Sequence, residues 1–518
     1  MDKLFNAMLL LLTLFTEIAL LCSCQNASFS CIQSERQALL KLKQSFSDSS
    51  HCLSSWKGKN CCMWKGVSCD ENNGHVVKLN LRAGSTSWLD NGSSLRAREV
   101  NSYITELRYL KYLDLSGNDF QDSAIPQFFS LMKQLRYLNI SDAGFSGSVP
   151  QNLGNLTSLR VLDLSTEHRG STLRVDDIQW ISHLVSLQQL GMAGIHLGEA
   201  RNLFQITGSI PNFSSNLMTI DLSNNLISGT LTEMIGDNNV LSKLQSLILS
   251  DNRVNGSIPN SFCHIETLEV LQLSKNKLSA NIPDCWRDYQ SLQVLDLSSN
   301  NLSGVIPSSI GHLNSLQWLH LSNNSLSGEP PLALKNCRDL VVLDLGENAL
   351  SGHVPKWIGD GFWQLSVLRL RKNKFSGTIP SQLCHISTLQ ILDLAENNLK
   401  GKIPYCFADF IGMVKTDVGD LEGYSGNFLT QWNNEHLTEV IKGRSLEYTK
   451  TLRFLVSMDL SSNKLEGSIP EELALLTGLI GLNLSHNQLS GQFPNKIGKL
   501  ESLESLDLSF NELSGMIP

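Results

Sequence analysis

The sequence predicts an α/β repeat solenoid, because one segment recurs at a fixed period with leucines at fixed places. LDLSSNNLSGVIP begins at Leu295, and LHLSNNSLSGEPP and LDLGENALSGHVP follow it, so that Asn300, Asn324 and Asn348 stand 24 residues apart. A period of this length is the signature of stacked coils, each of which forms one supersecondary unit. Stacked coils expose an extended surface, which favours binding over catalysis.

The leucines of each repeat predict one short strand per coil. In the pattern LxxLxLxxNxL, leucines two residues apart point into the core of a strand, so stacked strands form a long parallel sheet on a concave face. This pattern is the leucine-rich repeat. We expect the Asn side chain to satisfy backbone groups where the chain leaves the strand. The same column holds Asn118, Asn225, Asn252, Asn276, Asn373, Asn397, Asn463, Asn487 and Asn511, with Ala143, Glu167 and Ile195 as exceptions.

The N-terminus predicts secretion. A charged start, an apolar run from Met8 to Leu21 and small residues up to Cys24 indicate a signal peptide over residues 1–24. An uncleaved anchor is the alternative, because Glu17 interrupts the apolar run. The predicted domains are a cysteine-rich cap at 25–74, repeats at 75–404, an insertion at 405–453 and repeats at 454–518 that end without a cap.

Charge and sequons narrow the class of protein. A net charge of −8 and the lack of a basic stripe argue against nucleic acid as a partner. N-x-[ST] sequons support an extracellular glycoprotein, although the repeat itself produces several of them by coincidence. They stand at Asn26, Asn91, Asn139, Asn155, Asn212, Asn255, Asn301, Asn323 and Asn483.

The cysteines indicate disulfides rather than metal ligands, because the chain is expected in an oxidising compartment. Cys31, Cys52, Cys61, Cys62 and Cys69 crowd the cap. Farther along, Cys263 and Cys285 stand 22 residues apart, as do Cys384 and Cys406, so each pair is expected to join neighbouring coils. Cys337 is too far from the cap to pair there and is expected to be a buried free thiol.

Several motifs resemble plant leucine-rich-repeat receptor-like proteins, which are receptors without a kinase domain. They are SERQALLKLKQSF at 34–46, LSSW at 53–56 and CCMWKGVSC at 61–69, together with LSGxIP and LKNCRDLVVLDLGENALSGHVPKWIG at 334–359. The resemblance implies a plant-type superhelix with a disulfide-bonded cap, pairing Cys31 with Cys61 and Cys62 with Cys69. Cys52, whose partner is left open, departs from the usual four-cysteine cap.

The family resemblance also implies how such a chain works. It implies a glycosylated receptor at the extracellular face of the plasma membrane, which binds a peptide or protein signal in defence or development and acts through partner receptor kinases. The family's C-terminal cap and membrane helix do not appear before Pro518, so we expect a truncated member of the family. If the chain is instead complete, we expect it to be secreted to the apoplast. A decayed receptor gene is a further possibility.

The insertion at 405–453 is the first candidate site. Asn397 and Asn463 are 66 residues apart, and long insertions are usually functional. This segment resembles the family's island, which grips ligand or co-receptor, and a structural plug or a flexible loop is the alternative. Its candidate residues are Tyr424, Trp432, Lys442 and Tyr448.

The strand residues just before the insertion form the second candidate site. Side chains that flank the core leucines face the concave surface, and aromatic and Arg groups there suit a protein ligand. The alternative is that the charged residues only stabilise the repeat scaffold, whereas an exposed Trp318 indole favours binding. The candidates are Trp318, His320, Asp344, Glu347, Arg369, Arg371 and Lys372.

Neither candidate site contains a catalytic motif. The sequence has no HExxH, no nucleophile elbow and no phosphate loop, so we expect neither an enzyme nor a cofactor or metal.

The competing function is that of a soluble inhibitor of a secreted microbial hydrolase such as polygalacturonase. Such inhibitors share the cap and the LSGxIP repeat but are shorter and lack the insertion.

Overall fold

The computed structural model describes most of the repeat region. The described residues are 31–83, 94–167, 172–197, 216–235, 242–287, 291–414, 437–441, 444–448 and 454–516. The chain divides into two compact units, Met1–Arg174 and Val175–Pro518. The predicted signal peptide lies outside the described residues. None of the helices that are described is long and apolar enough to cross a membrane.

The first unit begins with the cap and continues into the first coils. Helix α2 (Gln33–Ser45) buries Ala38, Leu39 and Leu42. An antiparallel pair, β1 with β2, follows, and three parallel strands continue the sheet from β2. The strands of this sheet are β1 (Val67–Cys69), β2 (Val76–Asn80), β3 (Tyr112–Asp114), β5 (Tyr137–Asn139) and β7 (Val161–Asp163). A small second sheet pairs β4 (Ser123–Ala124) with β6 (Phe145–Ser146).

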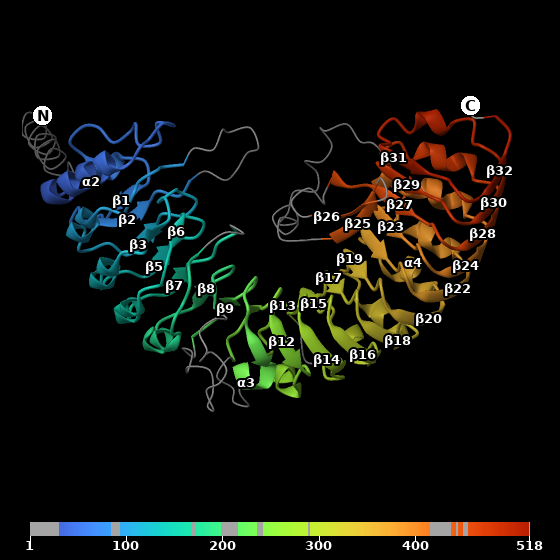
Figure 1. The fold of residues 1–518 in the computed structure, drawn as a ribbon, viewed down its shortest axis with the longest axis horizontal. Helices are drawn as coiled ribbons and strands as arrows, with labels where there is room; N and C mark the ends of the chain where they lie inside the picture. The colour runs from blue at the N-terminus through green and yellow to red at the C-terminus, as the bar shows by residue number, and fades with distance from the viewer. Residues whose placement is uncertain are drawn as a thin grey trace, which may run out of the picture. The chain divides into compact units, whose positions relative to one another are not determined.

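The second unit is an arc of stacked coils with a long parallel sheet along its inner side (Figure 1). The LxL segments form this sheet, with one strand from each coil in register with the next. It contains β8 (Gln189–Gly191), β9 (Thr219–Asp221), β11 (Ser246–Ile248), β13 (Val270–Gln272), β15 (Val294–Asp296), β17 (Trp318–His320), β19 (Val342–Asp344), β21 (Val367–Arg369), β23 (Ile391–Asp393), β27 (Ser457–Asp459), β29 (Gly481–Asn483) and β31 (Ser505–Asp507). The predicted concave sheet is thus confirmed.

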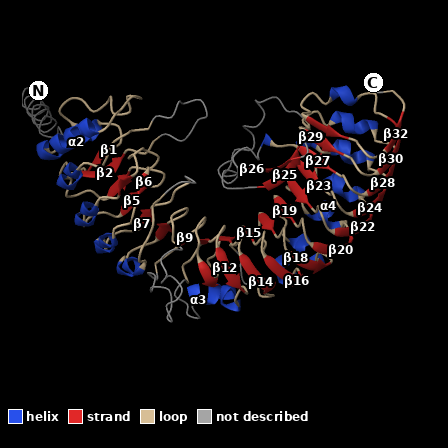
Figure 2. Ribbon diagram, viewed as in Figure 1, coloured by secondary structure: helices blue, strands red, loops and turns tan. Residues whose placement is uncertain are grey.

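A second parallel sheet runs along the outer side of the same arc, which the sequence analysis did not predict (Figure 2). The LSG segments form it. Gly304 adopts a φ of +79°, which a residue with a Cβ rarely adopts, and equivalent glycines recur along the sheet. The strands are β10 (Ser228–Thr230), β12 (Arg253–Gly256), β14 (Lys277–Asn281), β16 (Asn301–Val305), β18 (Ser325–Gly328), β20 (Ala349–His353), β22 (Lys374–Thr378), β24 (Asn398–Gly401), β28 (Lys464–Gly467), β30 (Gln488–Gln492) and β32 (Glu512–Ser514).

Short helices, mostly of the 3-10 type, complete the coils. Most start directly after a proline, whose fixed φ suits the entry to a helical turn. They and the two sheets enclose a column of apolar side chains, among them the fully buried Leu295, Leu319 and Leu343. The helices are η1 (Cys61–Met63), η2 (Ser102–Glu106), η3 (Gln127–Leu131), η4 (Gln151–Asn155), η5 (Gln179–His183), α3 (Leu231–Ile235), η7 (Asn260–His264), η8 (Ser308–His312), η9 (Leu332–Asn336), α4 (Trp357–Gly361), η10 (Ser381–His385), η11 (Tyr405–Asp409), η12 (Ile411–Met413), η16 (Glu471–Leu475) and η17 (Ile497–Lys499).

The repeated Asn side chains join neighbouring coils, as the sequence predicted. Asn324 Nδ2 donates to the carbonyl oxygens of Leu297, Leu321 and Ser322 at 3.0, 3.1 and 3.2 Å. Its Oδ1 accepts from the N–H of Leu302 at 3.0 Å. The backbone N–H and C=O groups that follow the strand would otherwise lack partners. The Asn side chain therefore supplies the hydrogen bonds that a neighbouring strand would make.

We expect Asn324→Ala to lower the free energy of unfolding by about 2 kcal/mol, because it leaves backbone donors and acceptors unsatisfied. Urea denaturation followed by circular dichroism measures the change. Lys374→Ala, an exposed residue at the start of β22, is the control and should stay within about 0.5 kcal/mol of the native chain. Equal stabilities of the two variants would contradict a structural role for the Asn.

Three predicted disulfides are present. Cys31 pairs with Cys61 and Cys62 with Cys69 in the cap, and Cys384 pairs with Cys406 between coils. Cys285 is disulfide-bonded, while the side chain of Cys263, its predicted partner, lies outside the described residues. Cys337 is a buried thiol, as expected, and burial raises its pKa to about 12.

The sequons differ in accessibility. Asn155, Asn255, Asn301 and Asn323 are exposed, which suits glycosylation, whereas Asn26, Asn91 and Asn212 lie outside the described residues. Asn139 is buried on β5, and its Oδ1 accepts from the N–H and the hydroxyl of Ser141. Asn483 is half-buried at the equivalent place on β29 and accepts the same two bonds from Ser485. These two sequons are products of the repeat, and glycosylation at Asn139 would require its side chain to leave the sheet.

Candidate functional site

Two rows of side chains cross the inner sheet of the second unit, one from the first residue of each strand and one from the third. Parallel register places Trp318 beside Val342 and His320 beside Asp344. The same register places Asp344 beside Arg369, and Arg369 beside Asp393. Side chains of neighbouring parallel strands are about 4.8 Å apart, so each row brings residues some 24 positions apart into contact.

The first row is apolar and buried. Val294, Trp318, Val342, Val367 and Ile391 belong to one hydrophobic cluster. Trp318 is only 1% exposed, so the prediction of an exposed indole is wrong. The cluster also includes Leu455, which lies directly after the insertion. Trp318 therefore contributes packing energy to the fold, because burying a tryptophan removes a large apolar area from water.

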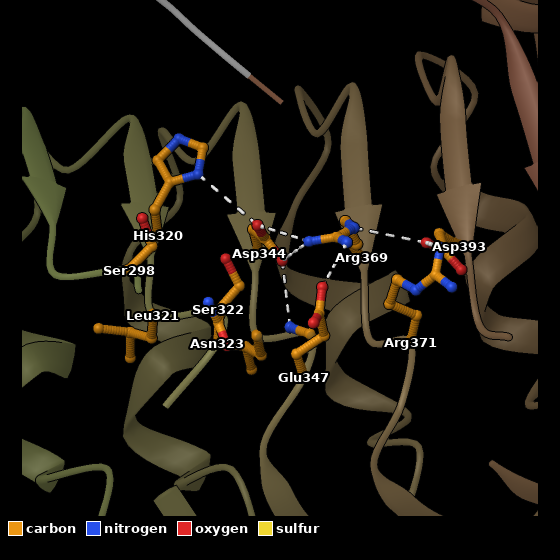
Figure 3. Close-up of polar contacts among 12 residues, drawn as sticks. Ser298, His320, Leu321, Ser322, Asn323, Asp344, Glu347, Arg369, Arg371 and Asp393 are labelled. Carbon is orange, nitrogen blue, oxygen red and sulfur yellow. Dashed lines mark hydrogen bonds and ion pairs between the residues drawn. The ribbon is translucent and has the colours of Figure 1, made fainter. Parts of the chain in front are cut away.

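The third strand residues form a buried polar row in which Arg369 lies between two aspartates, with His320 at one end (Figure 3). His320 Nδ1 lies 3.9 Å from Asp344 Oδ2, and Arg369 Nη1 lies 3.2 Å from the same oxygen. Arg369 Nε lies 3.4 Å from Asp393 Oδ2 on the next strand. Arg369 is 3% exposed. The guanidinium fork thus spans two carboxylates, a geometry that lysine cannot reproduce.

A second layer of charge extends this row toward solvent. Arg369 Nη2 donates to Glu347 Oε1 at 3.1 Å, and Lys372 Nζ lies 3.6 Å from Glu347 Oε2. Arg371 Nη2 donates to Glu396 Oε1 at 2.6 Å, while its Nη1 lies 3.5 Å from Asp393 Oδ2. Lys372 is 61% exposed, so the network reaches from the buried sheet to the surface.

The two buried aspartates of the row respond to their surroundings in opposite ways. Burial would raise the pKa of Asp344, but Arg369, His320 and Ser322 outweigh that effect and lower it well below its usual range. For Asp393 burial dominates and raises the pKa to about 7, with a further increase from Asp459 and an opposing effect of Arg371 and Arg369. Asp344 is therefore a permanent anion, whereas Asp393 holds a proton in mildly acid solution.

The predicted concave residues do come together, but most of them are closed to a ligand. Trp318, His320, Asp344 and Arg369 are buried, and Arg371 is nearly so. Glu347 and Lys372 remain accessible, as does Glu396 between them and the insertion. Glu347, Lys372 and Glu396 each precede a repeat Asn and adopt a positive φ near +52°, which fixes them at the turn after the strand. We call these three residues the rim.

The insertion contributes one described hairpin. Strand β25 (Leu437–Ile441) pairs antiparallel with β26 (Arg444–Tyr448), and Leu437 lies opposite Tyr448. In Figure 1 this hairpin lies on the inner side of the second unit, along which the long parallel sheet runs. Tyr424, Trp432 and Lys442 lie outside the described residues, and the side chain of Tyr448 is also not among those described.

Sequence families match the chain from the cap to the last repeats. The leucine rich repeat N-terminal domain matches residues 32–70. Leucine rich repeat families match residues 282–326 and 453–513, 134–156, 216–238, 243–265, 364–386 and 388–410, and 106–125.

The curated relatives are plant receptor-like proteins. Receptor-like protein EIX1 of Solanum lycopersicum is 38% identical over 200 residues, which cover 37% of this chain and 18% of that protein. Receptor-like protein EIX2 of the same species is 35% identical over 294 residues, covering 46% and 28%. The matched part of this chain thus spans well under half the length of these relatives.

Solved structures confirm the fold. The ectodomain of the plant membrane receptor kinase GASSHO1/SCHENGEN3 from Arabidopsis thaliana, in complex with CASPARIAN STRIP INTEGRITY FACTOR 2, superposes with a TM-score of 0.63. It is 26% identical, and the alignment covers 93% of this chain and 56% of that one. Cap, repeats and disulfides agree that the chain consists of a leucine rich repeat N-terminal domain followed by leucine rich repeats, and over the matched residues it is similar to plant receptor-like proteins.

Proposed function

We propose that this chain is the ligand-recognition part of a plant cell-surface receptor-like protein, which binds an extracellular peptide or protein in defence or development and acts through partner receptor kinases. Support comes from the receptor-like relatives and from the likeness to a receptor ectodomain in complex with another molecule. The observation that carries the proposal is the inner face itself, where a rigid, buried charge network holds an accessible rim in place.

The rim is the proposed contact surface on the sheet. Glu347, Lys372 and Glu396 present both signs of charge on neighbouring coils, which suits a polar peptide that crosses the strands. The buried residues beneath them act as positioning residues, because Arg369 and Arg371 tie the rim carboxylates to the sheet. The insertion residues Tyr424, Trp432, Lys442 and Tyr448 are proposed to supply the aromatic contacts that such a rim lacks.

Binding measurements on the secreted chain test this proposal. The probes are fractionated extracellular fluids from infected and healthy plant tissue and purified ectodomains of receptor kinases, applied to the immobilised chain. We expect saturable binding that Lys372→Glu weakens about tenfold, because a reversed rim charge removes one interface pair. Lys464→Glu, an exposed charge on the outer strand β28, is the control and should bind as the native chain does.

Two results would refute the proposal. One is the lack of saturable binding to every probe of both kinds. The other is equal binding by the Lys372→Glu and Lys464→Glu chains, which would place recognition away from the rim.

A further inference from the structure

Two adjoining hollows lie on the connections between short helices and inner strands of the second unit, away from the inner face. The first, of about 530 Å³, is lined by Arg287, Gly311, His312, Asn314, Asn336 and Arg338. The second, of about 410 Å³, shares Asn336 and Arg338 with the first and adds Lys335, Trp357, Asp360 and Trp363. Volumes of this size suit small ligands. Arg287 comes from the coil before η8, and the other residues lie on or directly after η8, η9 and α4, so four successive coils build one surface.

The first hollow offers hydrogen-bond donors and no carboxylate. Two guanidinium groups, two amides and one imidazole line it. Among the described residues, no ion pair within 4.0 Å joins Arg287 or Arg338 to a carboxylate. Asp284, outside the lining, interacts electrostatically with Arg287 and His312, so Arg338 is the cation with the weaker competition from the chain's own carboxylates. His312 Nδ1 donates to the carbonyl oxygen of Ser309 at 3.2 Å, which fixes the ring over its own helix. Such a lining binds an anionic group, for which arginine is well suited.

Close packing of neighbouring coils fixes the backbone beneath the first hollow. A Cβ at Gly311 would lie 2.3 Å from the carbonyl oxygen of Ala333, so only glycine permits η8 to approach η9 so closely. The backbone N–H groups of Asn314 and Arg338 donate to the carbonyl oxygens of His312 and Asn336. The surface therefore offers side chains rather than free backbone, and it lacks the ladder that an extended peptide would join.

The second hollow adds an aromatic wall. Trp363 is 64% exposed, although tryptophan is normally placed where its large apolar area is covered. Trp357 packs edge-on against the buried Phe362, with ring centroids 5.8 Å apart, and is thereby held in place. Asp360, which lies 3.2 Å from His385, supplies an acceptor for hydroxyl groups. A flat indole next to cations and polar side chains suits a sugar ring that carries acid groups.

We propose that the two hollows bind an acidic oligosaccharide, with its carboxylates against Arg287 and Arg338 and one sugar ring against Trp363. The apolar C–H face of a pyranose packs on the indole, and its hydroxyl groups bond to Asn336 and Asp360. This site is independent of the proposed receptor function, because none of its residues lies on the inner face or the rim.

Calorimetric titration of the secreted chain tests the proposal with four probes. They are a hexamer of galacturonic acid, its methyl ester, neutral cellohexaose and hexa-aspartate. We expect saturable binding of the uronate alone, with about tenfold loss for its methyl ester and for Arg338→Gln, because each removes a charge-assisted pair. Trp363→Ala should weaken binding about fivefold through lost ring contact.

Matched control variants test whether a loss of binding is specific to the residues of the two hollows. Arg253→Gln on β12 and Tyr405→Ala on η11 remove an exposed Arg and an exposed aromatic outside the hollows and should leave uronate binding unchanged. Circular dichroism checks that each variant is folded. The proposal is overturned if the uronate does not bind, if its methyl ester or cellohexaose binds equally well, or if Arg338→Gln and Trp363→Ala bind normally. Equal binding of hexa-aspartate would overturn it in favour of an acidic peptide.

Discussion

Replacement of Arg369 by methionine is expected to lower the free energy of unfolding by about 3–5 kcal/mol, the usual cost of removing one partner from a buried ionic network. Arg369 contacts Asp344, Glu347 and Asp393, and two of these carboxylates are buried. Without the guanidinium, Asp344 and Asp393 lose a common counter-charge in a medium that solvates them poorly. Methionine fills similar space, so the loss reports charge rather than a cavity.

Urea denaturation of the two chains measures this effect, with Lys372→Met as the control. Lys372 is exposed and pairs weakly with Glu347, so its replacement should change the free energy of unfolding by less than about 1 kcal/mol. Adding Asp344→Asn to Arg369→Met should restore part of the lost stability, because it removes an unpaired charge. A loss no greater than that of Lys372→Met would show that the charge network does not stabilise the sheet.

The sequence predicted the coils because their determinants are local. Leu295 lies in β15 and Leu297 directly follows this strand, and both side chains are buried. Asn324 bonds to groups in its own coil and in the one before, so both features recur with the 24-residue period. The outer sheet escaped prediction because its segments are only three to five residues long and contain Ser and Gly, which are weak strand formers.

The burial of the concave residues could not be predicted from their types. Trp318, Arg369 and Asp344 resemble ligand contacts when each is considered alone, but their exposure depends on residues far away in the sequence, such as Leu455. One signal was present. Among the third strand residues, Arg369 stands between Asp344 and Asp393 on neighbouring coils, and in-register neighbours of opposite sign neutralise one another.

A further expected result is that the chain becomes less stable as the pH rises from about 5 to 7.5. Strands β23 and β27 place Asp393 beside Asp459, and burial raises the pKa of both carboxyl groups, that of Asp393 to about 7. The unfolded chain has an ordinary aspartate pKa of about 3.9. Between these values the folded chain binds more protons than the unfolded one, so the free energy of unfolding falls with rising pH.

The size of the effect follows from the shift in pKa. Each unit is worth about 1.4 kcal/mol, so deprotonation of Asp393 should cost about 2–3 kcal/mol between pH 5 and 7.5. Its stabilising contribution is complete below pH 4 and is lost as the pH passes 7. Asp344 adds no slope here, because its pKa is lowered and it stays charged throughout. Thermal denaturation at several pH values should therefore show a higher Tm at pH 5.

Two variants separate this pair from the rest of the chain. Asp393→Asn mimics the protonated carboxyl group, so it should flatten the dependence on pH and raise the Tm at pH 7.5. Asp507→Ala removes the equivalent third residue on β31, where hydrogen bonds from Ser509 lower the pKa, and the slope should persist. If Asp393→Asn kept the full slope, the proton would belong to another group, and the two facing carboxylates would both be charged at neutral pH, held apart by Arg369 and Arg371.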